Sequence, residues 1–562
     1  MAALPQIRLH SAYSELTTSS HDALVVVCTA LDAPTLQSAS AACWAGAIAP
    51  YREVDREFGT SVVLVPAASV GGGRLVLSPT GTLDDDTDDV RKISGEHTPA
   101  ASGAGAFKSG VARAIEAGAQ RPAVLLALRL PAAGAVPDAD YSRWVEVALL
   151  AALDASYVTL VVREHRMATA GAGAVVEKLA SIGLVVEGAA DAAELSNAAK
   201  RAAAIEAGRR LALDMGYGDP ERMTPYSCAQ TIEAAVAAVP GVSYEEIKDL
   251  EVIRKEYPLL YNSARASFSE PTTRPCVVKL EYRSPEPAKV KEHLHLVGKG
   301  VTYDTGGISL KTGGSMRGMS RDKLGACGAA GFVLATGLIQ EPGLNISCIL
   351  ALERNSIGPN SLLPDEVVLS RAGVRVLISD TDAEGRLVMT DPVSECRERI
   401  LAARAAGDKT PAVICTVATL TGHVIRAYGP YGATVANGPA RGAKYDRRLA
   451  ASGLAYGDPF ENSIMRREDH QFVQAKTDRE DVYQSNSLPS TLTDRGHQYP
   501  AAFIIKASGL DKHSLSAGAQ LAIPFVHVDI AGSAEDAHVP GLGLCAITGS
   551  PVATFAGAFW TA

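Results

Sequence analysis

Three clusters of charged residues in the second half of the chain are spaced so that they could do chemistry together. The first, Lys299, Asp304 and Lys311, follows the apolar run 293–298 and is interspersed with glycines. Charged groups at the end of a buried strand, among residues that have no side chain, are typical of a site at the carboxyl edge of a sheet. We therefore expect these three side chains to lie at such an edge.

The second and third clusters supply carboxylates. Asp322 lies just before the apolar helical run 324–339, where a helix N-terminus favours a negative charge. The third cluster follows the short apolar run 374–378 and comprises Asp380, Asp382, Glu384 and Arg386. If that segment is extended, its last three charged side chains share one face. Carboxylates on one face repel one another unless cations neutralise them, so the clusters together favour a metal site over a solvated surface loop.

Other candidate sites have ordinary explanations. His293 and His295 share a strand face and could bind a metal, but no third His or Cys stands at a useful spacing, so we interpret them as strand histidines. The glycines 71–73 favour a turn over a phosphate cradle, and the acidic run 84–89 favours a solvated loop over a calcium loop. The sequence contains neither the H-E-x-x-H motif nor the G-x-S-x-G motif of two large hydrolase classes.

The elements that must position these residues follow from hydrophobic patterning. In the first 190 residues, β-branched runs alternate with alanine-rich helical patterns, which predicts a mostly parallel sheet with strands at 23–29, 61–66, 74–78, 123–128, 158–163 and 184–187. A linking helix is expected over 191–214, and Thr224 should cap a helix that starts at Pro225. Later apolar runs predict strands buried on both faces at 276–282, 293–298, 346–353, 412–418 and 524–530. We expect an α/β fold with two domains, 1–190 and 191–562.

Composition narrows the class of protein. The chain has 562 residues, 47% of them hydrophobic and 20% charged, which excludes a disordered chain. Its 62 acidic against 53 basic residues give a net charge of −9, so we expect no nucleic-acid partner. Nine cysteines without a C-x-x-C pair predict reduced thiols and a cytoplasmic protein. No signal peptide is evident, and the longest apolar stretch, 145–162, is interrupted by acidic residues, so we expect no membrane span.

Two segments carry a family resemblance. The stretches GKGVTYDTGG at 298–307 and DTDAEGRL at 380–387 resemble the signatures of the leucyl aminopeptidase (cytosol aminopeptidase) family of dimetal exopeptidases. Further similar segments are ATLTG at 418–422, VHVDIAG at 526–532 and TGSPV at 548–552. The resemblance covers roughly the last 350 residues. It implies an N-terminal macro-like α/β domain and a larger catalytic domain around a twisted mixed sheet flanked by helices.

The resemblance also implies roles. Lys299, Asp304, Asp322 and Glu384 would hold one divalent metal, and Asp304, Asp382 and Glu384 a second. Lys311 and Arg386 match the two catalytic positions, the latter holding a bicarbonate ion that serves as general base. The positions that line the first side-chain pocket are Met319, Thr419, Gly422, Ala531 and Ala534. The expected protein is a homohexamer with two ions of Zn²⁺ or Mn²⁺ per subunit, which removes N-terminal Leu and similar apolar residues from peptides.

Elementary chemistry supports these roles. A lysine ligand must be neutral, and deprotonating it at pH 7 costs roughly 4–5 kcal/mol, which a divalent cation can offset. Two metals can lower the pKa of a shared water and clamp the substrate. A charged lysine beside them, here Lys311, can stabilise the oxyanion that develops on the scissile carbonyl.

The chain departs from the family pattern at four positions. Asp380 stands where the family usually has Asn, Thr312 where it has Pro, Lys323 where it has an apolar residue, and Ser550 where it has Arg. None of these removes a ligand or a catalytic position. A carboxylate at 380 should tighten cation binding and make a nearby water harder to ionise, unless it pairs with a cation such as Arg375.

Two other functions are open from the sequence. The first domain could bind a nucleotide or ADP-ribose while the second half is an inactive relic, but the intact set of ligands argues against a relic. A DNA-binding role is the other, and the acidic balance argues against it.

Overall fold

The chain folds into two compact units, which are described separately. The N-terminal unit is Ala2–Glu206 with Leu454–Gly457, and the C-terminal unit is Ala207–Gly453 with Asp458–Ala562. The computed structural model describes residues 3–11, 15, 20–83, 89–94, 106–136, 139–170, 177–188, 191–518, 520–536 and 546–561. Residues 84–88 of the acidic run and Cys545 therefore lie outside the described residues.

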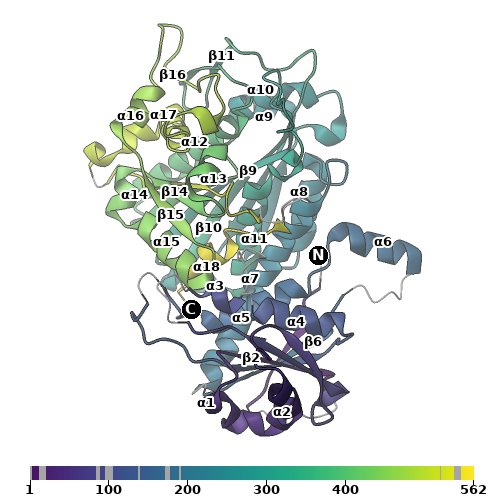
Figure 1. Cartoon of the computed structure of the whole chain (residues 1–562). Coiled ribbons are helices and arrows are strands. Elements are labelled where there is room, and N and C mark those ends of the chain that lie inside the picture. The colour runs from purple at the N-terminus through teal and green to yellow at the C-terminus, as the bar shows by residue number, and fades with distance from the viewer. Residues whose placement is uncertain are drawn as a thin grey trace. The chain divides into compact units, whose positions relative to one another are not determined.

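The N-terminal unit is built around a six-stranded sheet (Figure 1). Its strand order is β1-β6-β5-β2-β4-β3, and all neighbours are parallel except β3 and β4. The strands are β1 (Gln6–Leu9), β2 (Ala23–Cys28), β3 (Val63–Pro66), β4 (Arg74–Pro79), β5 (Pro122–Ala127) and β6 (Ser181–Val186). The helices are α1 (Ala33–Leu36), α2 (Ala45–Val54), α3 (Arg91–Ser94), α4 (Ala106–Glu116), α5 (Trp144–Ala155) and α6 (Leu160–Ala170). The alternation of strands and helices in the sequence is thus confirmed.

One expected strand is wrong. The run 158–163 enters helix α6, and Val161 and Val162 are 39% and 41% exposed. A buried strand would not expose two consecutive valines. Helix-forming residues such as Glu164, Arg166 and Met167 follow, so a helix extends back into the β-branched run against its local preference.

The C-terminal unit contains an eight-stranded mixed sheet with β9 near its centre. Its strand order is β15-β14-β17-β13-β9-β10-β8-β7, and β9 is parallel to both of its neighbours. The strands are β7 (Val242–Ile247), β8 (Cys276–Tyr282), β9 (Glu292–Asp304), β10 (Leu344–Asn355), β13 (Ala412–Ala418), β14 (Gly432–Ala436), β15 (Phe460–Ile464) and β17 (Phe525–Asp529). Shorter strands outside this sheet are β11 (Val367–Leu369), β12 (Arg375–Leu377), β16 (Val482–Tyr483), β18 (Glu535–Asp536) and β19 (Ala546–Ile547). The predicted α/β class, with a mixed sheet flanked by helices, is confirmed.

The helices of this unit include the predicted ones. The linking helix is α7 (Ala192–Tyr217), which belongs to the N-terminal unit up to Glu206 and to this unit from Ala207. Thr224 caps α8 (Pro225–Val236) through its hydroxyl, which accepts a hydrogen bond from the N–H of Ser227. The others are α9 (Leu250–Glu256), α10 (Pro258–Ser263), α11 (Leu324–Ile339), α12 (Glu384–Ala405), α13 (Gly422–Tyr428), α14 (Gly438–Gly442), α15 (Tyr445–Tyr456), α16 (Arg467–Phe472), α17 (Tyr499–Ala507) and α18 (Val552–Phe559).

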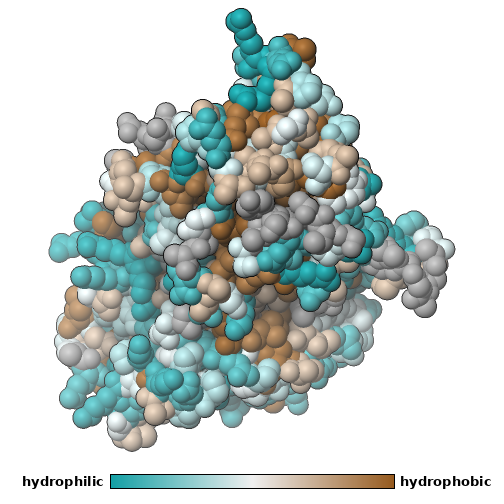
Figure 2. All heavy atoms as spheres, turned by 90° about the horizontal axis from the view of Figure 1, so that it is seen from below, coloured by the Kyte–Doolittle hydropathy of each residue, from teal (hydrophilic) through white to brown (hydrophobic). Residues whose placement is uncertain are grey.

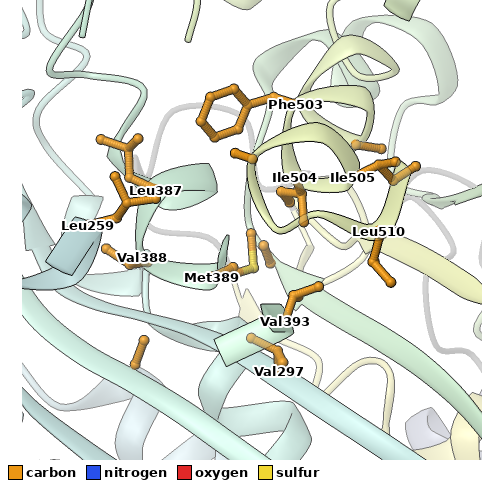
Figure 3. Packing of buried hydrophobic residues seen from close by; sticks show 14 of the residues in the cluster. Leu259, Val297, Leu387, Val388, Met389, Val393, Phe503, Ile504, Ile505 and Leu510 are labelled. Atoms are coloured by element: carbon orange, nitrogen blue, oxygen red, sulfur yellow. The ribbon is translucent and has the colours of Figure 1, made fainter. Parts of the chain in front are cut away.

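Helices α11 and α12 pack on opposite faces of β9. A Cβ atom added at Gly298 would lie 2.7 Å from the Cα of Ala326, so the glycine lets α11 approach the strand. Val297 and Val301 point the other way, into the core cluster that holds Leu387. Figure 3 shows this cluster, in which side chains of α12 and α17 pack beside Val297.

The apolar character of α11 is explained by burial. The stretch Met319–Ile339 is long and apolar enough to cross a membrane, but 89% of its most apolar window is buried inside the protein. Helices α5 and α6 are long and apolar enough to cross a membrane only if they are taken together as one span, and the two helices are bent by 42° relative to each other. On the face that Figure 2 shows, hydrophilic and hydrophobic residues are interspersed. Such scattered apolar residues are normal on a globular surface.

Candidate metal centre

Strand β9 places two of the predicted residues. Side chains alternate along a strand, so Lys299 faces α12 together with Val297 and Val301. The strand runs past its expected end at Gly298 to Asp304, level with the end of its parallel neighbour β10, whereas β13 on the other side ends at Ala418, level with Lys299. This is the predicted carboxyl edge of the sheet.

Lys299 lies among carboxylates in the interior. Its side chain is 4% exposed, and its Nζ atom lies 2.8 Å from Asp322 Oδ2 and 2.9 Å from Glu384 Oε1. It also donates a hydrogen bond of 3.2 Å to the carbonyl oxygen of Thr419. Burial by itself lowers the pKa of this lysine, but Asp322, Glu384 and Asp304 outweigh it and raise the pKa above its ordinary value.

Lys311 forms a second ion-paired group next to the first. Its Nζ atom lies 2.9 Å from Asp304 Oδ2 and 2.5 Å from Asp382 Oδ1. Asp304 is oriented through its other oxygen, which accepts hydrogen bonds of 2.8 Å from the N–H of Gly306 and from Asn355 Nδ2. The predicted convergence of Lys299, Asp304 and Lys311 is therefore confirmed in space.

The alternate spacing of the third cluster suggests an extended segment, but the structure shows a turn that leads into a helix. Residues 380–383 form the turn, and α12 begins at Glu384. Asp380 Oδ1 accepts a hydrogen bond of 3.0 Å from the N–H of Asp382 and so closes the turn. Arg375 pairs with Asp481 at 2.8 Å, so the suggested pairing of Asp380 with Arg375 is wrong.

Three of the carboxylates form a group that fits a metal ion. Asp304, Asp322 and Glu384 are buried, and each offers one oxygen within 4.8 Å of the others. Burial raises the pKa of Glu384 and raises that of Asp322 far above its ordinary value. Glu384 Oε2 is buried and has no hydrogen-bond partner in the described part of the chain. Buried oxygens that lack a partner and carry negative charge are the ligands that a divalent cation takes up.

Arg386 lies two residues, about half a turn, further along α12. Its side chain is buried, Nη1 donates a hydrogen bond of 3.0 Å to the carbonyl oxygen of Gln484, and the guanidinium lies 4.7 Å from the ring centre of Tyr499. Its Nε atom is buried without a hydrogen-bond partner among the described residues. The guanidinium is therefore held in place and retains an unused donor.

Known proteins are similar to this chain in sequence and fold. Residues 210–556 match the cytosol aminopeptidase family, catalytic domain. The chain belongs to this family. A Caenorhabditis elegans protein named "Putative aminopeptidase" is 35% identical over 477 residues, which are 85% of this chain and 84% of that protein.

Solved structures share the fold. The apo structure of leucyl aminopeptidase from Trypanosoma cruzi has a TM-score of 0.73 at 19% identity and covers 99% of this chain and 97% of its own. The bottromycin maturation enzyme BotP in complex with Mn has a TM-score of 0.68 at 20% identity and covers 96% of this chain and 99% of its own.

The positions expected from the resemblance to line the first side-chain pocket come after β9, β13 and β17 in the chain. Thr419 follows β13, and its hydroxyl donates a hydrogen bond of 2.9 Å to Asp322 Oδ1, which connects it to the carboxylate group. Gly422 begins α13, Ala531 and the buried Ala534 follow β17, and Met319 begins a short 3-10 turn three residues before Asp322. The carbonyl oxygen of Met319 accepts a hydrogen bond of 3.2 Å from the N–H of Asp322, and no hydrogen bond among the described residues connects Gly422, Ala531 or Ala534 to the three carboxylates.

Three supporting residues were missed in the sequence. Asp529 ends β17 and accepts hydrogen bonds from the N–H groups of Leu420 and Ala531, so it joins the two loops that carry pocket positions. Asn355 ends β10 and orients Asp304. Gln484 accepts a hydrogen bond from the N–H of Asp380. The first two are polar residues at the end of an apolar strand, the same signal that identified Asp304.

Two of the family departures have local partners. Lys323 is fully buried, and its Nζ donates hydrogen bonds to the carbonyl oxygens of Gly218 and Ser320. Ser550 donates to Asp458, with 2.9 Å between Ser550 Oγ and Asp458 Oδ1. Both residues therefore have their polar groups satisfied within the fold.

Proposed function

We propose that this member of the cytosol aminopeptidase family is a leucyl aminopeptidase that hydrolyses N-terminal Leu and similar apolar residues from peptides. The observation that carries the proposal is the buried group of Asp304, Asp322 and Glu384 around Lys299. Gly422, Ala531 and Ala534, three small residues at the proposed pocket positions, support an apolar substrate side chain. The proposed protein is a cytoplasmic homohexamer.

Two divalent cations complete the proposed site. Lys299, Asp304, Asp322 and Glu384 would hold one, and Asp304, Asp382 and Glu384 the other, so Asp304 and Glu384 belong to both sets. Zn²⁺ and Mn²⁺ are the proposed ions, and the Mn in the fold relative BotP supports the second. When bound, the cations supply Lewis acidity and a water of lowered pKa.

The chain's own residues supply the remaining chemistry. The ion pairs with Asp322 and Glu384 hold Lys299 in its charged form. To serve as a ligand it would have to lose its proton, because a metal binds the lone pair of the neutral amine. Lys311 stays charged and stabilises the negative charge that develops on the carbonyl oxygen. Arg386, held by Gln484 and Tyr499, would hold a bicarbonate ion through its guanidinium, and that ion would supply the general base.

A single assay tests the reaction class. Hydrolysis of leucine p-nitroanilide is expected to fall to background after chelation and to return with Mn²⁺, Co²⁺ or Zn²⁺. The release of p-nitroaniline measures it, and alanine and glutamate anilides measure the side-chain preference. Full activity in protein shown by atomic absorption to be free of metal would contradict the proposal.

Metal binding should depend on pH through Asp382. Burial and the charge of Asp304 raise the pKa of Asp382 to about 7 in the metal-free protein. The protonated carboxyl is therefore favoured below pH 7, and a metal must displace that proton. We expect the affinity for the second metal to fall by up to about tenfold per pH unit below pH 7 and to change little above pH 8. Calorimetric titration with Mn²⁺ between pH 5.5 and 8.5 measures this, and a flat profile would contradict it.

Asp380→Asn separates geometry from charge. An Asn side-chain oxygen can still accept the N–H of Asp382, so the turn should persist while the negative charge is lost. Because a nearby negative charge disfavours ionisation of a water, we expect the acidic-limb pKa of kcat/KM to fall by up to about one pKa unit. The control Asp380→Ala removes both features. Superimposable pH–rate profiles of Asp380→Asn and the wild type would contradict an electrostatic effect.

A further inference from the structure

The C-terminal unit has a cavity of about 340 Å³ at the other end of β9 from the carboxylates. Its floor is formed by the neighbouring strands β8, β10 and β9, and its wall by the last turns of α12 and the loop that follows. His295, which lines it, lies about 13 Å along the strand from Lys299, at roughly 3.3 Å per residue. The cavity is therefore separate from the proposed metal site.

His295 has unused hydrogen-bonding capacity in this cavity. Its residue is 9% exposed, and its Nδ1 atom is buried with no hydrogen-bond partner in the described ranges. Burial and the nearby Arg399 lower the pKa of this histidine to about 3, so the ring is neutral, with one donor and one acceptor. A neutral ring with an unmatched buried nitrogen, in a residue that lines a cavity, points to a polar ligand that completes the hydrogen bonding of the ring.

The cationic groups of the cavity gather on one side. Glu281 of β8 accepts hydrogen bonds from Arg399 Nη1 at 2.6 Å and from Arg283 Nη2 at 2.9 Å. Arg399 also donates to Ser347 Oγ at 2.8 Å and to Glu395. Two guanidinium groups therefore share one lining carboxylate, and the side chain of Arg283 is still 65% exposed and can turn toward a ligand.

The opposite side carries an acidic group. His293 Nε2 lies 3.0 Å from Asp408 Oδ2, and the other oxygen of Asp408 accepts the N–H of Thr410. Asp408 is 37% exposed in its side chain. Strand β10 separates β8 from β9, so the arginine side and the aspartate side are about two strand spacings, roughly 10 Å, apart at the backbone.

The charges of this lining balance. The two arginines match Glu281 and Asp408 in number, and the neutral ring of His295 adds no charge. A simple anion would meet the two carboxylates as like charges, and a simple cation would meet the two guanidinium groups. A ligand that carries one charge of each sign avoids both costs.

We propose that this cavity binds a small zwitterion, with its carboxylate at Arg283 and Arg399, its ammonium group at Asp408, and a hydrogen bond to His295. A free amino acid and a dipeptide share this chemistry and differ in the separation of their charges. The site does not require the proposed peptidase activity. If that activity holds, the cavity binds the kind of molecule that the reaction consumes or releases.

Calorimetric titration of the full-length, metal-loaded protein tests the site. Leucine has the charge separation of an amino acid. The compound 5-aminopentanoate has the charge separation of a dipeptide and no peptide bond to cleave. The probe that binds more tightly shows whether the site prefers a free amino acid or a dipeptide. Leucinamide lacks the carboxylate and 4-methylpentanoate lacks the ammonium group. We expect both to bind at least tenfold more weakly than leucine at this site. Equal binding of either would overturn the proposal.

Two variants locate the binding event. Arg283→Gln should weaken it at least tenfold, and so should His295→Phe, which keeps an aromatic ring of similar size but removes both ring nitrogens. The matched controls are Arg254→Gln, whose side chain is 64% exposed on α9, and His165→Phe, exposed on α6; both should bind like the wild type. Competitive inhibition of peptide hydrolysis by leucine should be the same in all five proteins. The proposal is overturned if Arg283→Gln and His295→Phe both leave the titration unchanged, or if the protein shows only binding that competes with peptide.

Discussion

Glu384→Gln is expected to remove both metals and to reduce peptide hydrolysis to background. Glu384 belongs to both proposed ligand sets; its Oε1 atom lies 2.9 Å from Lys299 Nζ, and its Oε2 atom lacks a partner among the described residues. Glutamine keeps the volume but supplies neither the charge nor a second equivalent oxygen. Loss of a group that only supports a ligand costs about 10–100-fold in metal affinity, so loss of a shared ligand should cost more than about 100-fold.

The measurement is metal content after dialysis, together with hydrolysis of leucine p-nitroanilide. Glu395→Gln is the matched control, because Glu395 is a buried carboxylate on the same helix, 2.8 Å from Lys279 Nζ, and has no proposed metal role. The control should lose stability and keep its metals. Two full equivalents of metal in Glu384→Gln would refute its place in both ligand sets.

Much of this site could be predicted because one physical rule applies to it repeatedly. Polar residues at the end of an apolar strand lie at the carboxyl edge of a parallel sheet: Asp304 ends β9 and Thr419 follows β13, whereas Lys299 lies inside β9, level with the end of β13. The same rule applies to Asn355 and Asp529, which we overlooked because a single Asn or Asp after a strand is common in turns. The bounds of α11 were predicted correctly, because its apolar run is long and ends without ambiguity.

The third cluster shows where the rule is insufficient. Alternate spacing of Asp382, Glu384 and Arg386 suggests a strand, but Leu387, Val388 and Met389 behind them are all buried, as in a core helix. Glu384 contacts Lys299 as the first residue of a helix, and the spacing of the charged residues does not predict that helix start.

Long-range pairing could not be predicted from one sequence. Arg375 pairs with Asp481, 106 residues away, although Asp380 is much closer along the chain.

The glycines in and beside the first cluster also have different structural roles. Gly298 makes room for α11, whereas a Cβ atom at Gly306 would lie 2.9 Å from Asp382 Oδ1, so only the second admits a site residue.

Lys311→Ala is expected to lower kcat by about 10²–10³-fold, the usual cost of losing one donor to a developing oxyanion. KM should change little, because the lysine acts mainly in the transition state. Lys311 contacts Asp304 and Asp382 but belongs to neither proposed ligand set, so the variant should keep both metals. Its ammonium group also competes with a cation for those two carboxylates, and its removal should leave metal affinity equal or higher.

Steady-state kinetics with leucine p-nitroanilide and metal analysis of the same sample measure both effects. Lys299→Ala is the contrasting variant, because Lys299 is a proposed ligand and its loss should lower the metal content. Lys311→Arg keeps a positive charge on a longer, planar group and should recover part of kcat. An unchanged kcat in Lys311→Ala would remove it from the mechanism. Loss of metal in Lys311→Ala would instead show that the amine of Lys311 is a ligand. The roles of the two lysines would then be exchanged, because each of them forms ion pairs with two of the carboxylates.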